Sequence, residues 1–219
     1  MTAGQDGTGN GKGPADQHGR LPWFRPDELS PEQRDYYDRL TAGPRSRAAL
    51  LDEHGRLQGA FNARLLDPPL GTTIEQVGAV LRYGTPALTG RQREIAILEV
   101  ARSERSGYEW RAHSQAGLAA GLRPGELDAL RHGRSLDSFD PAETLTRRVV
   151  QALVTDKDLD DTLFAAAEQG LGLTVLFDLI SLVGYYQHTA LALRVWRVPM
   201  DPDSDPFAAP RATGTAPGH

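Results

Sequence analysis

Apolar residues recur along most of the chain at intervals of three and four, which is the spacing of one face of an α-helix. In residues 72–84, Ile74, Val77, Val80 and Leu81 fall on one such face. No run of residues alternates convincingly between apolar and polar, as a half-buried strand would. The segments with a helical signal are 30–40, 57–66, 72–84, 89–104, 107–121, 123–133, 140–156, 159–171 and 173–196. The pattern therefore predicts an all-α domain of about eight helices.

Residues that favour helix ends bound several of these segments. Ser30 stands before Pro31, and Asp140 stands before Pro141 with Glu143 three residues after it. A capping side chain followed by proline in the first turn is typical of a helix start, and an acidic third residue completes a capping box. We expect helices to begin at both places.

The boundary near residue 70 has competing signals. Pro68 and Pro69 are expected to end the short apolar segment before them. Thr72 or Thr73 would then cap the next helix, and Gly84 would stop it.

Composition separates two polar tails from the helical region. Residues 1–20 are rich in glycine and polar residues, and residues 200–219 are rich in proline and aspartate near their start. Such segments bury too little apolar surface to fold alone, so both are predicted to be disordered. Residues 21–199 are predicted to form one domain.

The overall charge and the cysteine count exclude several functions. Net charge is −5 over 219 residues, without the basic footprint of a nucleic-acid-binding protein. The chain has no cysteine, which excludes thiolate nucleophiles and cysteine-ligated zinc. No two of its six histidines have the helical spacing of metal ligands. We therefore expect neither a metal nor a cofactor.

No segment has the pattern of a membrane span. Residues 171–186 are the longest apolar stretch, but Asp178 interrupts them and polar residues follow. The N-terminus lacks the hydrophobic core of a secretory signal. The sequence thus predicts a cytoplasmic protein with a buried C-terminal helix and no contact with membranes.

The densest cluster of reactive side chains is SGYEWRAHSQAG, residues 106–117. Glu109 and His113 are four residues apart, so they lie on one helical face and can exchange protons. The same spacing is also common in surface pairs that contribute only a few tenths of a kcal/mol. One helix earlier, Glu94 lies beside an apolar stripe, although an edge position would explain it equally well.

A longer stretch resembles a known family. Residues 88–130, LTGRQREIAILEVARSERSGYEWRAHSQAGLAAGLRPGELDAL, are similar to the carboxymuconolactone decarboxylase family, which includes the alkylhydroperoxidase (AhpD-like) proteins. Residues 29–45 resemble its leading segment and residues 177–199 its closing helix. The resemblance implies an all-helical fold and assembly into trimers or hexamers.

The resemblance also implies roles for residues. Its redox branch uses a Cys-x-x-Cys-x-x-x-His site with a glutamate one helix earlier. Ser106 and Glu109 stand where the two cysteines would be, while His113 and Glu94 match the histidine and the relay glutamate. A dithiol peroxidase needs an attacking thiolate, so this chain does not fit that branch.

The decarboxylase branch fits the remaining groups. We expect Glu94, Glu109 and His113 to be catalytic, with His113 as the proton donor, Glu109 orienting it and Glu94 completing the relay. The expected substrate is a small carboxylated lactone or keto acid. An arginine should hold its acid group, and Arg82, Arg91 and Arg93 are candidates.

Two further expectations stay open. Tyr185 and Tyr186 could line the pocket, but packing in the last helix is the favoured role for both. The alternatives to a cofactor-free lyase are a redox protein, disfavoured by the missing cysteines, and a helical binding or assembly module without catalysis.

Overall fold

The structure is a computed structural model that describes residues 17–43 and 50–208. These residues contain nine α-helices and one pair of two-residue strands, so the predicted all-α fold is confirmed. The chain divides into two compact units, which we describe separately. Unit 1 is Met1–Gly71 with Trp196–Pro199, and unit 2 is Thr72–Val195 with Met200–His219.

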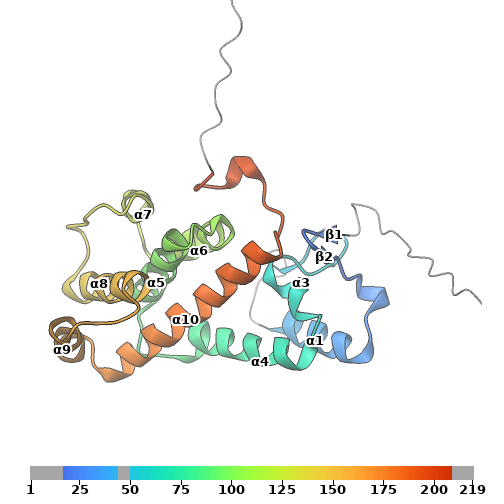
Figure 1. The fold of residues 1–219 in the computed structure, drawn as a ribbon, viewed down its shortest axis with the longest axis horizontal. Coiled ribbons are helices and arrows are strands. Elements are labelled where there is room, and N and C mark those ends of the chain that lie inside the picture. The colour runs from blue at the N-terminus through green and yellow to red at the C-terminus, as the bar shows by residue number, and fades with distance from the viewer. Residues whose placement is uncertain (1–16, 44–49, 209–219) are drawn as a thin grey trace, which may run out of the picture. The chain divides into compact units, whose positions relative to one another are not determined.

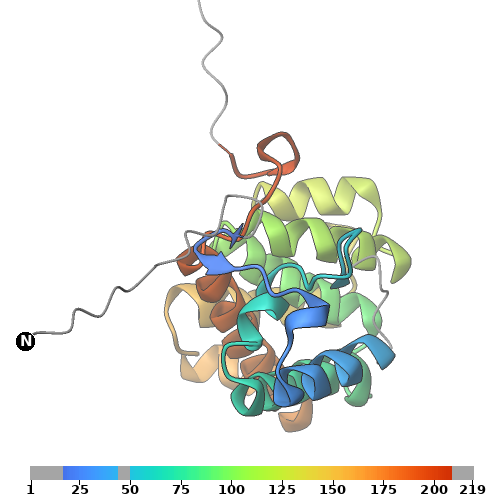
Figure 2. The same ribbon diagram turned by 90° about the vertical axis from the view of Figure 1, so that its right-hand side faces the viewer.

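Unit 1 is built around a small core of five buried side chains from α1 and the segments after it. Its elements are β1 (Gln17–His18), β2 (Leu21–Pro22), η2 (Pro26–Glu28), α1 (Pro31–Ala42), α3 (Ala60–Arg64) and the first turn of α4 (Pro68–Ala79). The core side chains are Tyr36, Leu40, Leu50, Leu57 and Leu65. Two-residue strands are too short to leave an alternating pattern, so the sequence did not predict the hairpin, drawn in blue in Figure 2.

The ends of two helices follow from local residues as expected. Ser30 accepts a hydrogen bond from the Gln33 amide and Gln33 reaches back to Ser30, which closes a capping box before α1. Asp140 and Glu143 form the same arrangement before α8 (Pro141–Thr155). Both starts are confirmed because each uses only contacts within one turn.

The boundary near residue 70 was predicted wrongly. α4 begins at Pro68, so the two prolines open a helix instead of ending a segment, and neither Thr72 nor Thr73 caps it. Asp67 accepts a hydrogen bond from the Leu70 amide at 3.1 Å. Proline is tolerated in the first turn because its missing N–H would have no helical partner there.

Unit 2 holds the remaining helices, with α5 at its centre (Figure 1). Its elements after α4 are η3 (Val80–Gly84), α5 (Gly90–Ser103), α6 (Gly107–Ala119), α7 (Pro124–Arg131), α8, α9 (Asp161–Gly170), α10 (Leu173–Val195) and η4 (Pro202–Ser204). α5 packs against α6, α7, α8 and α10. It is therefore buried along most of its length, from Glu94 to Ala101.

Of the predicted tails, residues 1–16 and 209–219 lie outside the described residues. Residues 17–20 belong to the β-hairpin of unit 1. Residues 200–208, red in Figure 1, pack on the start of α6, where the rings of Phe207 and Trp110 meet edge to face at 5.5 Å. Arg105 also donates to the Phe207 carbonyl at 2.7 Å.

Among the described residues, no single helix has the length and apolar composition to cross a membrane. The pair α9 and α10 meets those criteria only when taken together, with a bend of 117° between the two.

Candidate active site

Glu94 and His113 form a close and buried polar contact between α5 and α6. The Glu94 Oε2 atom lies 2.7 Å from Nδ1 of His113. Both side chains are buried, at 6% and 3% exposure. An ionised carboxylate can only accept, so Nδ1 is the nitrogen that carries hydrogen and donates. The contact fixes the ring and leaves Nε2 as the nitrogen that can exchange a proton.

Glu109 lies on the other side of the same ring. Its Oε2 atom is 3.5 Å from Nε2 of His113, one helical turn along α6. This distance is long for a hydrogen bond, although it still allows an ion pair when the ring is protonated. The structure thus brings Glu94, Glu109 and His113 together. The tight contact belongs to Glu94, whereas the sequence interpretation had assigned the orienting role to Glu109.

Two tyrosines complete the surroundings of this cluster. The Tyr186 ring meets the His113 ring edge to face, with centroids 5.0 Å apart. Burial raises the pKa of Tyr186 well above its ordinary value, although Arg82 acts in the opposite direction. Burial, reinforced by the charge of Glu109, raises the pKa of Tyr108 to about 12. Both side chains therefore stay neutral phenols near pH 7.

Helix packing explains why the three reactive residues meet. Glu94 lies on α5, and Glu109 and His113 share one face of α6. Gly117 continues that face, and a Cβ there would lie 2.9 Å from Leu122 and 3.6 Å from Leu98. The absence of a side chain at Gly117 thus lets Leu98 of α5 approach α6 closely.

The three candidate arginines have different surroundings. Arg91 is paired with Glu143 at 2.5 Å and with Glu126 at 3.4 Å, which ties α5 to α7 and α8. Arg93 donates to backbone carbonyls at the end of the loop before α5. Arg82 lies in η3, a π-helical turn, and the charges of Glu94 and Glu109 act on its guanidinium. Arg82 directly follows Leu81, which packs in the same buried core cluster as Tyr186.

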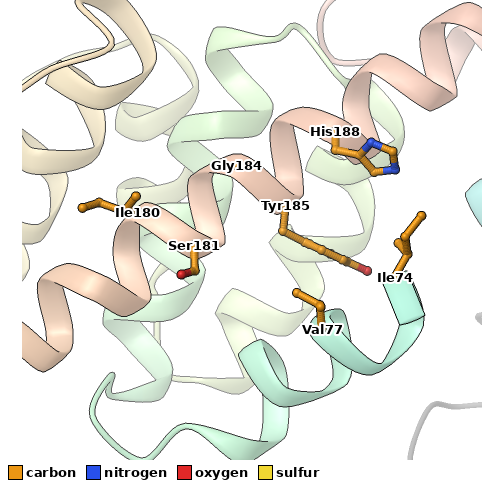
Figure 3. A pocket seen from close by; sticks show the side chains of 7 residues that line it. All are labelled: Ile74, Val77, Ile180, Ser181, Gly184, Tyr185 and His188. Atoms are coloured by element: carbon orange, nitrogen blue, oxygen red, sulfur yellow. The ribbon is translucent and has the colours of Figure 1, made fainter. Parts of the chain in front are cut away.

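An apolar groove of about 290 Å³ lies between α4 and α10. Figure 3 shows the Tyr185 ring reaching from α10 toward Ile74 and Val77 on α4. The other lining residues are Ile180, Ser181, Gly184 and His188. Glu94, Glu109 and His113 do not line it; Tyr185 links it to the cluster, because its ring meets that of Tyr186 at 5.2 Å.

Within residues 17–43 and 50–208, no group of three or more His, Asp or Glu side chains is arranged to hold a metal ion.

Sequence reasoning assigned too little weight to Tyr186. It lies 73 positions after His113, on a different helix, and its buried neighbours in α10 are typical of core packing. No local spacing joins it to His113. Only the resemblance of the closing helix to a family segment pointed to this part of the chain.

Comparison with known proteins adds one finding. Residues 68–152 match the family model described as "Carboxymuconolactone decarboxylase family". The match runs from α4 into α8 and includes Arg82, Glu94, Glu109 and His113, while α10 lies beyond it. No curated protein matches the chain.

Proposed function

Residues 68–152 belong to the carboxymuconolactone decarboxylase family, and from this premise we propose that the chain is an acid/base lyase that needs no cofactor. The reaction is the decarboxylation of a small carboxylated lactone or keto acid. His113 is the proton donor, Glu94 is the positioning residue for its ring, and Glu109 is the charged neighbour of its Nε2 atom.

The reaction requires little more than one proton at the right place. The bond from carbon to the substrate carboxylate breaks, and carbon dioxide leaves. The bonding electron pair stays on carbon and is delocalised into the adjacent carbonyl group of the substrate. Nε2 of His113 then gives its proton to that carbon, and solvent returns a proton to the ring. A positioned general acid contributes about 10²- to 10⁴-fold to such a step.

The contact between Glu94 and His113 is the observation that supports this proposal most directly. A buried carboxylate 2.7 Å from Nδ1 holds the imidazole in one orientation. The contact with Glu109 lies at the opposite nitrogen. An imidazole held in this way at one nitrogen and free to exchange a proton at the other is suited to proton transfer.

We also propose that the chain associates with itself through α10. Five large side chains follow one another along its exposed face at intervals of three, four or eleven residues, and each is 45–69% exposed. They are Leu173, Phe177, Ile180, Leu191 and Val195. The one long gap, between Ile180 and Leu191, contains Gly184 and His188, which line the groove. A long helix that is apolar on all sides is expected to be buried, and a second copy would cover this face.

A turnover assay tests the catalytic proposal. The protein is incubated with a panel of carboxylated lactones and β-keto acids, and release of carbon dioxide is followed for wild type and for His113→Asn. We expect wild type to act on at least one compound and the variant to lose about 10²- to 10⁴-fold in kcat. His132→Asn is the matched control, because His132 is exposed on α7.

Two results would contradict the proposal. The first is a His113→Asn variant that is folded, by its thermal unfolding, and turns over as fast as wild type. The second is robust turnover of an organic hydroperoxide with a dithiol donor, which would favour the redox alternative. If no compound in the panel reacts while the protein keeps its biological activity in the His113→Asn form, the chain is a module without this chemistry.

A further inference from the structure

Arg82 differs from the other arginines of unit 2 that lie away from solvent. It is half-buried, yet among the described residues its guanidinium makes no hydrogen bond and no ion pair. It only lies over the Tyr83 ring, 5.4 Å from the centroid. The other half-buried or buried arginines of this unit donate to a carboxylate or a carbonyl oxygen: Arg91 to Glu143, Arg93 to Leu88, Arg102 and Arg147 to Glu99, and Arg131 to Asp128.

The position of Arg82 is set by a local irregularity of the backbone. After α4, the chain widens into the π-helical turn η3, which ends with the Thr85 amide bonded to the Val80 carbonyl at 3.1 Å. π-helical turns occur often at functional sites, where they redirect a side chain. Leu81 is buried in the same core cluster as Tyr186, so η3 is anchored against α10. Arg82, the next residue, is thereby held beside the cluster.

Two contacts lead from η3 to the catalytic groups: Leu81 packs in the core cluster that holds Tyr186, and the Tyr186 ring meets the His113 ring at 5.0 Å. Burial lowers the pKa of Arg82, but the combined effect of Tyr186, Tyr83, Glu94 and Glu109 outweighs burial and raises it above its ordinary value. The side chain therefore stays charged next to two buried carboxylates. A cation that is partly removed from water and has no bonded partner is costly, and an incoming anion would supply the missing partner.

Arg82 is more accessible to solvent than the three candidate catalytic residues. Glu94, Glu109 and His113 are all at most 8% exposed, whereas Arg82 has intermediate exposure. The two glutamates repel any substrate carboxylate, so an anion can approach only where a positive charge offsets them. A guanidinium can hold a carboxylate through two parallel hydrogen bonds and so also fixes its orientation.

We propose that Arg82 binds the carboxylate of the substrate and holds it beside His113, an assignment that rests on the function proposed above. Arg91 is bonded to Glu143. One terminal nitrogen of Arg93 donates to the carbonyls of Thr85 and Leu88, while its Nε atom is buried without a hydrogen-bond partner, so we assign the role to Arg82. Arg82 acts in substrate binding, before the bond between carbon and the substrate carboxylate breaks.

Kinetics separate binding from a structural role. Arg82→Gln should raise KM about 10- to 100-fold while kcat changes by less than about threefold, which is the signature of a lost ground-state contact. Arg82→Lys keeps the charge but loses the paired hydrogen bonds, so its KM should fall between those of wild type and Arg82→Gln. Arg111→Gln is the matched control, because Arg111 is exposed on α6 and lies outside any ion pair among the described residues.

A binding measurement tests Arg82 without turnover. In the His113→Asn background, calorimetry with a saturated butyrolactone bearing one carboxylate should show binding, and the corresponding carboxamide should not bind. Adding Arg82→Gln should weaken binding of the acid at least 10-fold. The double variant must first be shown to unfold at the same temperature as His113→Asn; if it does not, the comparison is made with Arg82→Lys.

The outcomes also distinguish this inference from the proposed function. Equal affinity of the acid with and without Arg82→Gln overturns the assignment, as does equal affinity for acid and carboxamide. Arg82-dependent binding in a wild-type protein that decarboxylates nothing would support Arg82 and contradict the lyase. Turnover that requires His113 and is unchanged by Arg82→Gln would support the lyase and contradict the role of Arg82.

Discussion

His113 has a different neighbour at each ring nitrogen, and this asymmetry gives the two glutamates unequal roles. Glu94 is within hydrogen-bond distance of Nδ1, while Glu109 is 3.5 Å from Nε2. Removing the close partner frees the ring to rotate and to change tautomer. Removing the distant one leaves the ring in place.

We therefore expect Glu94→Gln to reduce kcat more than Glu109→Gln, by at least about 10-fold, since an orienting hydrogen bond in a triad-like arrangement has large effects on rate. Steady-state kinetics on the same substrate measure both variants. Glu168→Gln, at an exposed position of α9, is the control for loss of one charge. Equal losses in the two variants would show that Glu94 does not act through ring orientation.

At the scale of the element, the start of α6 depends on a segment far away in the chain. Ser106 precedes α6 but makes no side-chain capping bond. Asp205 lies against Gly107 instead, close enough for a Cβ there to be 2.2 Å from its Oδ1 atom. An acidic side chain at a helix N-terminus is favourable because of the helix dipole. Residues 200–208 thus stabilise the helix that carries Glu109 and His113.

Gly107→Ala should displace this segment and destabilise the protein by about 1–3 kcal/mol, the usual cost of overpacking. Urea unfolding measures the free energy, and hydrogen exchange at residues 200–208 should become faster. Gly125→Ala is the matched control in α7, where a new Cβ meets no atom within 4 Å. It should stabilise the protein by about 0.5–1 kcal/mol. Unchanged exchange at residues 200–208 in Gly107→Ala would contradict this role of Asp205.

At the scale of the whole molecule, the apolar face of α10 is the largest feature without an explanation inside one chain. Its side chains alternate with buried ones such as Leu179 and Leu182, so the helix is apolar both toward the core and away from it. Single exposed apolar residues are ordinary, whereas several large ones on one face of a long helix mark a surface that binds something.

Phe177→Asp should convert a self-associated protein into a monomer, because a charge at the most exposed position of this face would have to be buried in the contact. Sedimentation equilibrium measures the mass in solution. Phe164→Asp is the control, since Phe164 is exposed on α9 and outside this face. A wild-type protein that is monomeric at about 100 μM, well above the dissociation constants typical of stable contacts, would end the proposal.

Local patterns sufficed where the deciding contacts lie within one or two helical turns. The starts of α1 and α8 and the pairing of Glu109 with His113 on α6 are of this kind. The boundary at Pro68 was missed, although Asp67 was visible in the sequence, because proline can either end a helix or open one. The residues around Pro68 and Pro69 decided that these prolines open a helix.

The sequence by itself determined the helical class, and it predicted both the candidate reactive groups and a resemblance that the match of residues 68–152 to a family model supports, since each follows from residue type and short spacing. Only the tertiary structure decided that Glu94 is the close partner of His113 and that Tyr186 covers the ring. It also decided that, of the three candidate arginines, Arg82 is the one that makes no hydrogen bond or ion pair with the described residues. Those contacts join separate helices, and their geometry depends on how the side chains between the helices pack, which no spacing along the chain encodes.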